Sequence, residues 1–219
     1  MSCQEQDVKI PVNDNPGIHE VWDNSRIYVL FNSKNGDTVA NLKLGQTITT
    51  THWLTAVDKR LKLKHLTGAL NKILKKRHKK SIHSKEGTHA YFTYLDSTSK
   101  QVSFIDFDSL QLMPDYYTST GYLKKYPQAD KEYSRLHLKI FRDKISLNDS
   151  TDFSGLTKIQ INDSIRQLTK NTPDKTKNIL YLNFDKEIYF DRFLDYYTFF
   201  KNNPVHNGKL SSKIFIFTP

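Results

Sequence analysis

The chain has 219 residues, of which 37% are apolar and 12% aromatic, enough apolar material for one large folded domain or two small ones. No window approaches the roughly eighteen consecutive apolar residues that a transmembrane helix needs. The formal net charge is +10, but it belongs to one segment: eleven of the Lys and Arg residues lie between Lys59 and Lys85, and the other residues hold 22 basic and 23 acidic side chains.

Residues 1–24 are polar and are predicted to form an N-terminal tether. Cys3 is the only cysteine of the chain, which excludes an intramolecular disulfide and a multi-cysteine zinc site. The stretch SCQEQD resembles the mature start of a bacterial lipoprotein, especially of the Bacteroidetes type, in which a polar, acidic tether follows the lipidated cysteine. This resemblance implies lipid attachment at Cys3 and a periplasmic or outer-membrane location in the cell envelope. Met1 and Ser2 leave no room for a signal peptide, so a cytoplasmic protein is the alternative.

Residues 25–112 are predicted to form an N-terminal half with the element order βββαββ. Asn35-Gly36 is a hairpin signal, because both residues accept a positive φ. Apolar residues recur at helical spacing from Leu63 to Leu74. Three strand candidates rich in apolar or β-branched residues precede that helix, at 27–31, 38–44 and 46–58. Two aromatic strands follow it, at 89–96 and 101–112, with the predicted core residues Tyr91, Phe92, Tyr94, Phe104, Ile105 and Phe107.

The predicted helix from Leu63 carries the cationic segment on its outer face. A localised positive field attracts phosphates, anionic lipid or an acidic protein surface. Lysine greatly outnumbers arginine in the segment, which argues against bidentate recognition of bases or phosphates, and no aromatic residue interleaves with the charges. The pattern therefore favours an anionic surface or a protein partner over nucleic acid. The side chains predicted to contact this partner are Lys72, Lys75, Lys76, Arg77, Lys79 and Lys80.

Residues 113–132 show no clear period and are predicted to be a connector, whereas residues 133–219 are predicted to form a second half with the order ββαβαβ. Its first hairpin is expected within 135–149, where apolar and polar residues alternate. The other predicted elements are a helix at 161–175, a strand at 178–188, an aromatic helix at 189–204 and a terminal strand at 212–219.

The predicted helix 161–175 places Ile161, Ile165 and Leu168 on one face, and Pro173 ends it. The following strand is apolar on nearly every residue, as expected of a central strand that is covered on both faces.

This second half resembles the periplasmic domain of the ExbD and TolR family over residues 136–219. The resemblance is carried by LHLKIFRDKISLN as the first hairpin, by SIRQLTKNTPDKTKNILYLNFD as helix and central strand, and by EIYFDRFLDYYTFF before KIFIFT. Asp185 stands where the family often places an Asp after its central strand. The resemblance implies a dimerising or partner-binding module. It does not imply energy transduction, because the family's transmembrane helix with its proton-coupling acid has no counterpart in this sequence.

Three groups of residues invite a chemical interpretation. Asp106 and Asp108 would share one face of a strand and could bind a metal for phosphoryl chemistry, although Phe in and Asp out is also the pattern of a half-exposed strand. Asp185 can act in a site after the central strand or cap the next helix. The histidines are spaced five and six residues apart in a Lys-rich stretch, which opposes metal binding, at His78, His83 and His89. No metal site or cofactor is predicted.

Taken together, these patterns predict an α+β fold, an α/β sandwich of two related halves. The leading functional hypothesis is a non-catalytic cell-envelope lipoprotein that binds a protein partner or an anionic surface, with self-association left open. The alternative is a cytosolic nucleic-acid-binding protein that uses the basic helix at residues 59–85. A metal-dependent nuclease that uses Asp106 and Asp108 is a third hypothesis, and catalytic activity is otherwise not expected.

Overall fold

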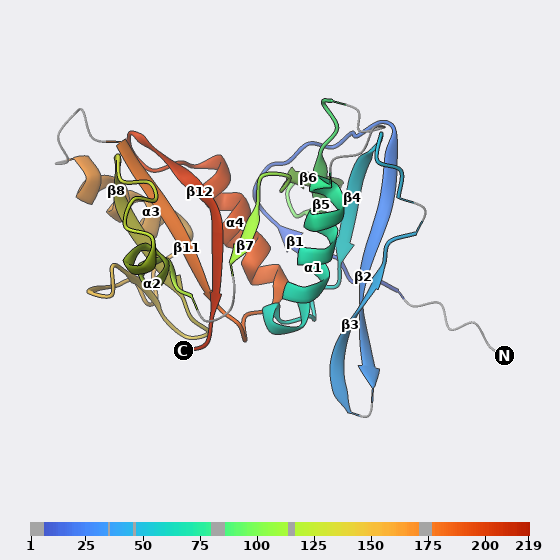
Figure 1. Ribbon diagram of the computed structural model, residues 1–219, viewed down its shortest axis with the longest axis horizontal. Helices are drawn as coiled ribbons and strands as arrows, with labels where there is room; N and C mark the ends of the chain where they lie inside the picture. Colours follow the sequence, from blue (N-terminus) through green and yellow to red (C-terminus); the bar gives the residue numbers. More distant parts are fainter. Residues whose placement is uncertain (1–6, 35, 46, 80–85, 114–116, 171–176) are drawn as a thin grey trace. The chain divides into compact units, whose positions relative to one another are not determined.

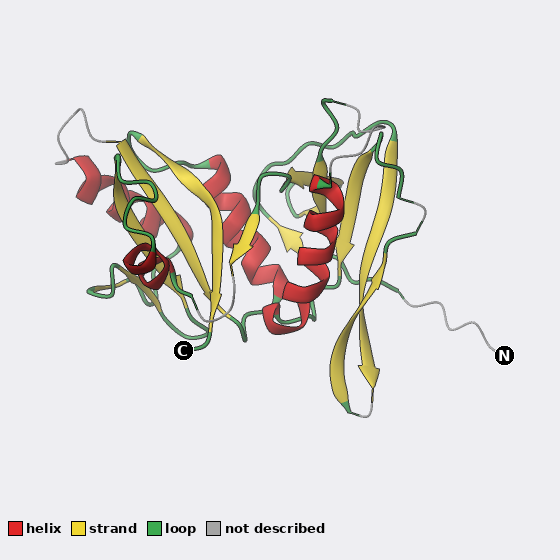
Figure 2. Ribbon diagram, viewed as in Figure 1, coloured by secondary structure: helices red, strands yellow, loops and turns green. Residues whose placement is uncertain are grey.

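The computed structural model describes residues 7–34, 36–45, 47–79, 86–113, 117–170 and 177–219 (Figure 1). The chain divides into two compact units. Unit 1 comprises Met1–Leu110 and Tyr189–Asp195, and unit 2 comprises Gln111–Ile188 and Tyr196–Pro219. The described residues form four helices and two mixed sheets of six strands, one sheet in each unit (Figure 2). The predicted α+β class is confirmed.

Unit 1 is built on a sheet with the strand order β1-β5-β4-β2-β3, in which β6 also pairs with β5. The neighbours β2, β4 and β5 are parallel, whereas β3 is antiparallel to β2 and pairs with no other described strand. The bounds are β1 Val12–Asn13, β2 Asn24–Lys34, β3 Asp37–Lys43, β4 His52–Val57, β5 Ala90–Asp96 and β6 Val102–Asp106.

Helix α1, Leu63–His78, connects β4 to β5 and has the predicted apolar stripe. The stripe packs on the sheet because residues three and four apart share one face of a helix. Its buried members are Leu63, Leu66, Ala69, Leu70, Ile73 and Leu74. Of the predicted aromatic core, Phe92, Tyr94 and Phe107 are fully buried, whereas Phe104 is only half-buried.

Part of the predicted tether is folded. Val12 lies opposite Leu95 where β1 pairs in parallel with β5. Asn13 and Asn15 are buried, and their polar groups are satisfied locally, since the Asn13 side-chain oxygen accepts bonds from Asn15 N at 3.0 Å and Asn15 Nδ2 at 2.6 Å. Tyr94 donates its hydroxyl proton to the Asn15 carbonyl at 2.9 Å. A polar composition therefore did not mean absence of structure.

Other boundaries also differ from the sequence prediction. The third strand forms only over 52–57, because the β-branched residues before it close a turn in which Thr51 N donates to the Ile48 carbonyl at 3.3 Å. Cys3, Asn35, Lys80, His83 and Pro173, which carried predictions, lie outside the described residues.

Unit 2 contains a sheet with the order β10-β9-β8-β11-β12-β7. β11 lies between β8 and β12, parallel to both and buried along nearly its whole length, so the predicted central strand is confirmed. The strands are β7 Gln111–Met113, β8 Tyr133–Ile140, β9 Ile145–Leu147, β10 Thr151–Asp152, β11 Lys177–Asp185 and β12 Gly208–Phe217. The helices are α2 Ser119–Lys125, α3 Lys158–Lys170 and α4 Phe190–Asn202, of which residues 190–195 belong to unit 1.

Two expectations for unit 2 require correction. The segment expected as a connector, 113–132, contains the last residue of β7 and the whole of α2, and Leu123 of α2 packs in a cluster with Tyr181 and Phe215. Leu168 was expected on the buried face of its helix but is 55% exposed. The buried stripe of α3 runs through Ile161, Ile165 and Thr169 instead, at a spacing of four residues. Thr169 can be buried there because its hydroxyl donates to the Ile165 carbonyl at 2.9 Å.

The two units share a topology: a hairpin, a strand parallel to its first strand, a helix, and another parallel strand. In unit 1 these are β2–β3, β4, α1 and β5, and in unit 2 they are β8–β9, β11, α4 and β12. Unit 2 inserts α3 between its hairpin and the next parallel strand. The described residues between β3 and β4 of unit 1 form no helix, so the hairpin of unit 1 lacks the corresponding cover.

Gly17 is expected to be essential for docking the N-terminal segment. A Cβ atom there would lie 2.7 Å from the Phe104 carbonyl oxygen and would also press on the Tyr94 hydroxyl. Replacing Gly17 with Ala should lower the free energy of unfolding by about 1–3 kcal/mol, measured by urea denaturation.

Gly68→Ala is the matched control, because a Cβ at this position in α1 meets open space. It should raise the free energy of unfolding by up to about 1 kcal/mol through helix propensity. Equal effects of the two substitutions would show that the close packing at Gly17 does not exist.

Candidate functional site

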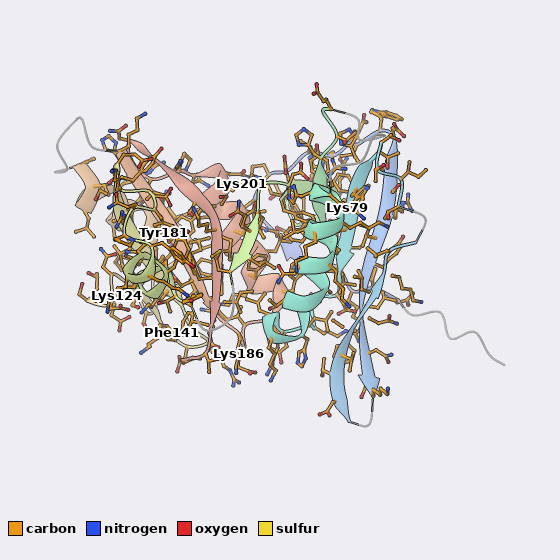
Figure 3. All side chains as sticks on the ribbon, in the orientation of Figure 1. Lys79, Lys124, Phe141, Tyr181, Lys186 and Lys201 are labelled. Carbon is orange, nitrogen blue, oxygen red and sulfur yellow. The ribbon has the colours of Figure 1, made fainter. Side chains whose placement is uncertain are left out.

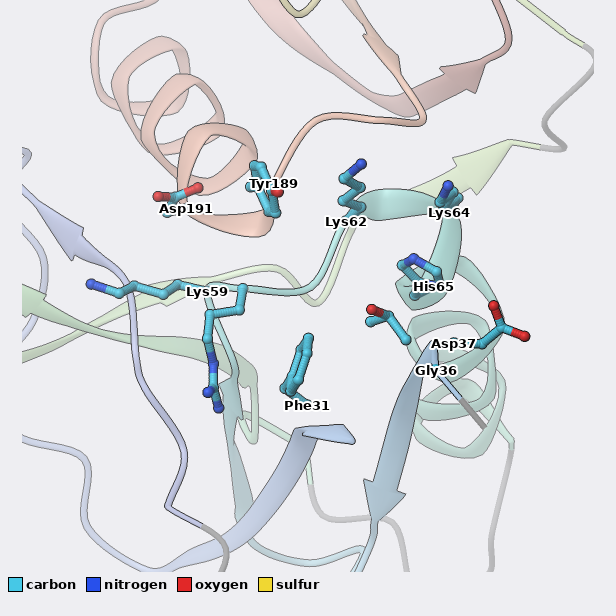
Figure 4. A pocket seen from close by; sticks show the side chains of 11 residues that line it. Phe31, Gly36, Asp37, Lys59, Lys62, Lys64, His65, Tyr189 and Asp191 are labelled. Atoms are coloured by element: carbon cyan, nitrogen blue, oxygen red, sulfur yellow. The ribbon is translucent and has the colours of Figure 1, made fainter. Parts of the chain in front are cut away.

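A pocket of about 720 Å³ opens beside the start of α1 in unit 1 (Figure 4). One side is formed by the residues that follow β4 and by the first turn of α1, and another by the hairpin β2–β3. Figure 4 shows Lys62 and Tyr189 on one side of the opening and Phe31 on the other. The lining residues are Phe31, Gly36, Asp37, Thr38, Lys59, Arg60, Lys62, Lys64, His65, Tyr189 and Asp191.

The segment between β4 and α1 is fixed by its backbone. Asp58 N donates to the Val29 carbonyl at 2.9 Å, and Lys59 N donates to the Lys9 carbonyl at 2.8 Å. Leu61 is fully buried, and its carbonyl accepts a bond from Phe190 N at 2.8 Å. Because the backbone is held in this way, the basic side chains that alternate with the buried residues are carried to the pocket.

Asp58 organises this segment through its side chain, which is completely buried. Its carboxylate accepts bonds from Arg60 Nε at 2.9 Å, Arg60 Nη2 at 2.6 Å and Arg60 N at 3.0 Å. Burial opposes ionisation, but the bonds from Arg60 outweigh it, so the pKa of Asp58 lies below its ordinary value. The Arg60 guanidinium also lies 4.6 Å from the centre of the Phe31 ring. Arg60 is therefore held in place by Asp58 and Phe31.

The first turn of α1 has an unusual charge. Lys62 is the N-cap residue, its side chain makes no capping hydrogen bond, and the first turn contains no acidic residue. A helix N-terminus carries a partial positive charge and is normally accompanied by acids. Here Lys62 and Lys64 add positive charge to it, and the acids in the lining are Asp37 and Asp191 from other elements. The pocket therefore concentrates positive potential.

The six side chains predicted to contact an anionic partner have different environments. Lys72, Lys75 and Lys79 are exposed, and Figure 3 shows Lys79 at the end of α1. Lys76 donates to the Thr47 hydroxyl and lies 5.9 Å from the centre of a Trp53 ring. Lys80 is outside the described residues.

Arg77 has a structural environment, with 8% of its side chain exposed. Its Nε atom lies 3.1 Å from Asp108 Oδ1, and its Nη2 donates to the Thr88 hydroxyl at 2.8 Å. The guanidinium also lies 5.4 Å from the centre of a Trp53 ring. Arg77 thus ties the end of α1 to the sheet and does not present an open contact surface.

Asp106 and Asp108 meet in a turn and do not share a strand face, because β6 ends at Asp106. Asp108 N donates to Asp106 Oδ1 at 2.7 Å. Each carboxylate has its own cationic or imidazole partner: Asp106 lies 3.1 Å from His89 Nδ1, and Asp108 pairs with Arg77. In the part of the chain that the structure describes, no group of three or more His, Cys, Asp or Glu side chains is arranged to hold a metal ion.

Asp185 lies at the end of β11 and is 5% exposed. Its Oδ1 accepts a bond from Glu187 N at 2.9 Å, and its carbonyl accepts one from Ile188 N at 3.0 Å. These bonds close the turn that leads into α4. His78 is exposed at the end of α1, and His89 stacks on His52 with ring centres 6.1 Å apart.

Sequence reasoning missed a buried polar network in unit 2. The Ser119 hydroxyl lies 2.8 Å from His137 Nδ1, and Ser119 N donates to Asn183 Oδ1 at 2.6 Å. His137 stacks on Tyr181 at 5.5 Å, and burial lowers the pKa of His137. Ser119 is completely buried, so this pair offers no nucleophile to a substrate and instead fixes α2 on the sheet. The four residues come from three elements, α2, β8 and β11, and no local pattern marks them.

Comparisons with models of protein families, with curated proteins and with solved structures found no match. Among the described residues, no helix has the length and apolar character needed to cross a membrane.

Arg77 is expected to contribute to stability more than the exposed lysines of α1. Arg77→Gln should lower the free energy of unfolding by about 1–3 kcal/mol, since it leaves Asp108 without its ion pair. Lys75→Gln should change it by less than about 0.5 kcal/mol. Urea denaturation of both variants tests this expectation, and equal values would contradict it.

The Asp58–Arg60 pair predicts a pH dependence. A depressed pKa in the folded state favours the ionised carboxylate, so the stabilisation is present above about pH 4 and is lost as the pH falls through the folded pKa. Asp58→Asn should lower the free energy of unfolding by about 2 kcal/mol at pH 7, with a smaller difference at pH 3.

Urea denaturation at several pH values measures this difference. Glu20→Gln, at an exposed carboxyl, is the control and should change stability by less than about 0.5 kcal/mol. A loss for Asp58→Asn that is constant from pH 7 to pH 3 would contradict the prediction.

Proposed function

We propose that this chain is a non-catalytic binding protein whose cationic pocket receives a carboxylate-rich segment of a protein partner. The observation that carries the proposal is the convergence of Lys59, Lys62, Lys64 and His65 on one pocket at the start of α1. Positive side chains gathered in a concave site raise the local concentration of anions and strengthen each contact with them.

The arginines bear on the choice between carboxylate and phosphate. The Arg guanidinium can bind a phosphate or a base edge through two parallel hydrogen bonds. Both arginines of the segment 59–85 already face an Asp carboxylate, Arg60 that of Asp58 and Arg77 that of Asp108. The remaining cations are lysines, which suit single carboxylates as point charges.

The aromatic rings of the pocket favour the same choice. Binding of single-stranded nucleic acid relies on open ring faces for base stacking. Arg60 lies over Phe31 at 4.6 Å, and Lys62 lies over Tyr189 at 5.6 Å, so a cation occupies one face of each ring. A flat anionic membrane would contact exposed lysines such as Lys75 and Lys79 better than it would enter a pocket.

We also propose that this binding takes place at the bacterial cell envelope. Lipid attachment at Cys3 would place the binding unit at the bacterial cell envelope, and the likeness of residues 136–219 to a partner-binding periplasmic module agrees with a protein ligand. The alternative, cytosolic binding of nucleic acid, is tested by the same experiment.

Binding can be measured with the full chain and a fluorescein-labelled polyglutamate peptide by fluorescence anisotropy at low salt. The triple variant Lys59→Gln, Lys62→Gln, Lys64→Gln should weaken binding by about tenfold or more, given roughly 0.5 kcal/mol or more for each lost charge contact. The control triple Lys124→Gln, Lys131→Gln, Lys170→Gln removes the same charge from exposed positions in unit 2 and should change affinity less than about twofold.

Equal losses in the two triple variants would reduce the effect to net charge and overturn the proposal. A single-stranded oligonucleotide that binds more tightly than polyglutamate, and loses affinity in Lys75→Gln, Lys79→Gln, would establish the nucleic-acid alternative instead. Likewise, tighter binding to vesicles rich in phosphatidylglycerol than to polyglutamate, lost in Lys75→Gln, Lys79→Gln, would establish an anionic membrane surface as the partner.

A further inference from the structure

Strand β3 is an edge strand of unusual length and character. It spans seven residues, whereas the outermost strands of unit 2, β7 and β10, span three and two residues. Proteins usually protect sheet edges with short strands, prolines or charges. β3 has charges only at its two ends, Asp37 and Lys43, and its middle, Thr38 to Leu42, has none. Val39 within it is 41% exposed.

A groove of about 580 Å³ runs between β3 and α1. On the sheet side it is lined by four consecutive residues of β3, Val39 to Leu42, and by Asn32 of β2, which is paired with Val39. Because side chains alternate between the faces of a strand, four consecutive residues bring the backbone of β3 to the groove as well. The helix contributes residues spaced three and four apart, which lie on one stripe: His65, Gly68, Ala69 and Lys72. Gly68 has no side chain that projects into the groove, and a Cβ atom at this position would meet open space.

The groove adjoins the cationic pocket. His65 lines both, and the pocket reaches β3 at Asp37 and Thr38, directly before the residues that line the groove. Figure 4 shows His65 beside Asp37 and Gly36, at the junction of the hairpin and the helix. Together, the pocket and the groove line β3 over Asp37 to Leu42, a length of about 20 Å at about 3.3 Å per residue.

We propose that the acidic partner binds in extended form and adds a strand to the outer edge of β3, in the groove beside α1. Its backbone would bond to the N–H and C=O groups of β3 that point away from β2, and its carboxylates would meet Lys72 in the groove and the lysines of the pocket. Strand addition gives affinity through backbone bonds and specificity through side-chain pockets. The inference rests on the proposed function, from which it takes the acidic nature of the partner.

Charge complementarity selects this occupant over a second copy of the chain. In an antiparallel pair of two β3 strands, the Lys43 end of each strand would lie beside the cationic pocket at the Asp37 end of the other, and Lys43 would repel the lysines of that pocket. An acidic peptide meets no such repulsion.

The test uses the full chain and a labelled peptide of about eight residues with alternating Glu and Val, which places the carboxylates on one face of a strand. Gly68→Trp should fill the groove and weaken binding by about tenfold or more. Gly68→Ala, at the same position, should bind within about twofold of the original chain. Circular dichroism and thermal unfolding confirm that both variants fold, which the open surroundings of Gly68 favour.

A second arm changes the peptide and leaves the protein intact. Methylating the backbone nitrogen of alternate peptide residues removes their N–H groups but keeps every carboxylate. Of the two peptides methylated on alternate residues in opposite phase, the one that loses the N–H groups facing β3 should bind about tenfold or more weaker than the other.

Unchanged binding by Gly68→Trp, or equal affinity of both methylated peptides and the parent peptide, would overturn strand addition. The proposed function would survive that result if the pocket triple variant still weakens binding, and it would fail if that variant binds normally. Dimerisation of the chain in sedimentation experiments that Gly68→Trp abolishes would assign the edge to a second copy and would also overturn the inference.

Discussion

The buried carboxylate of Asp58 is the interaction on which the candidate site depends. It receives the Arg60 guanidinium and the backbone N–H groups of Arg60 and Lys9, so it joins the end of β4, the start of α1 and the N-terminal segment. A buried charge is costly unless it is fully paired, and such pairing fixes the geometry of the groups around it. The positions of the lysines that flank Arg60 are fixed in turn, because the backbone that carries them is held by these bonds.

The comparison of the two units explains why a groove exists beside α1. Parallel strands connected by right-handed crossovers place their helices on one face, so α3 and α4 both belong to the same face of the sheet of unit 2. Unit 1 follows the same order of strands but reaches β4 from its hairpin without a helix among the described residues. Among the described residues, the hairpin β2–β3 therefore has no counterpart of α3, and the groove lies between β3 and α1.

The hydrophobic periods of the sequence were sufficient to predict α1, the central position of β11 and the α+β class. A leucine stripe and an uninterrupted apolar strand each predict which residues are buried, and this prediction does not depend on the rest of the fold. The cationic segment was also evident, but its residues could not be sorted by counting charges. Arg77 and Lys79 are both basic residues of the same segment, and nothing in the sequence distinguishes them. In the structure, Arg77 bonds to Asp108 and Thr88, whereas Lys79 is exposed.

The features that sequence reasoning missed depend on contacts between distant residues. Asn13 and Asn15 were predicted to lie in a tether because their local sequence is polar. They are buried because their polar groups bond to each other and because the Asn15 carbonyl accepts a bond from Tyr94, 79 residues further along the chain. Leu168 was expected to be buried, but Thr169 is buried instead, because a hydroxyl that bonds back to its own helix can be buried at little cost. The pocket joins residues near 31, 60 and 190, a combination that no local period marks.

Two departures from ordinary stability rules meet at the start of α1, and their coincidence supports a binding role. Cations at a helix N-terminus lower stability, and a long strand edge without charges in its middle lowers solubility, and natural proteins usually avoid both. Here they adjoin, with Lys62 and Lys64 in the pocket next to the groove between β3 and α1. An acidic peptide in extended form would satisfy both at once, because its carboxylates would balance the charges and its backbone would complete the sheet. Departures from consistent local design are expected where a protein binds its ligand.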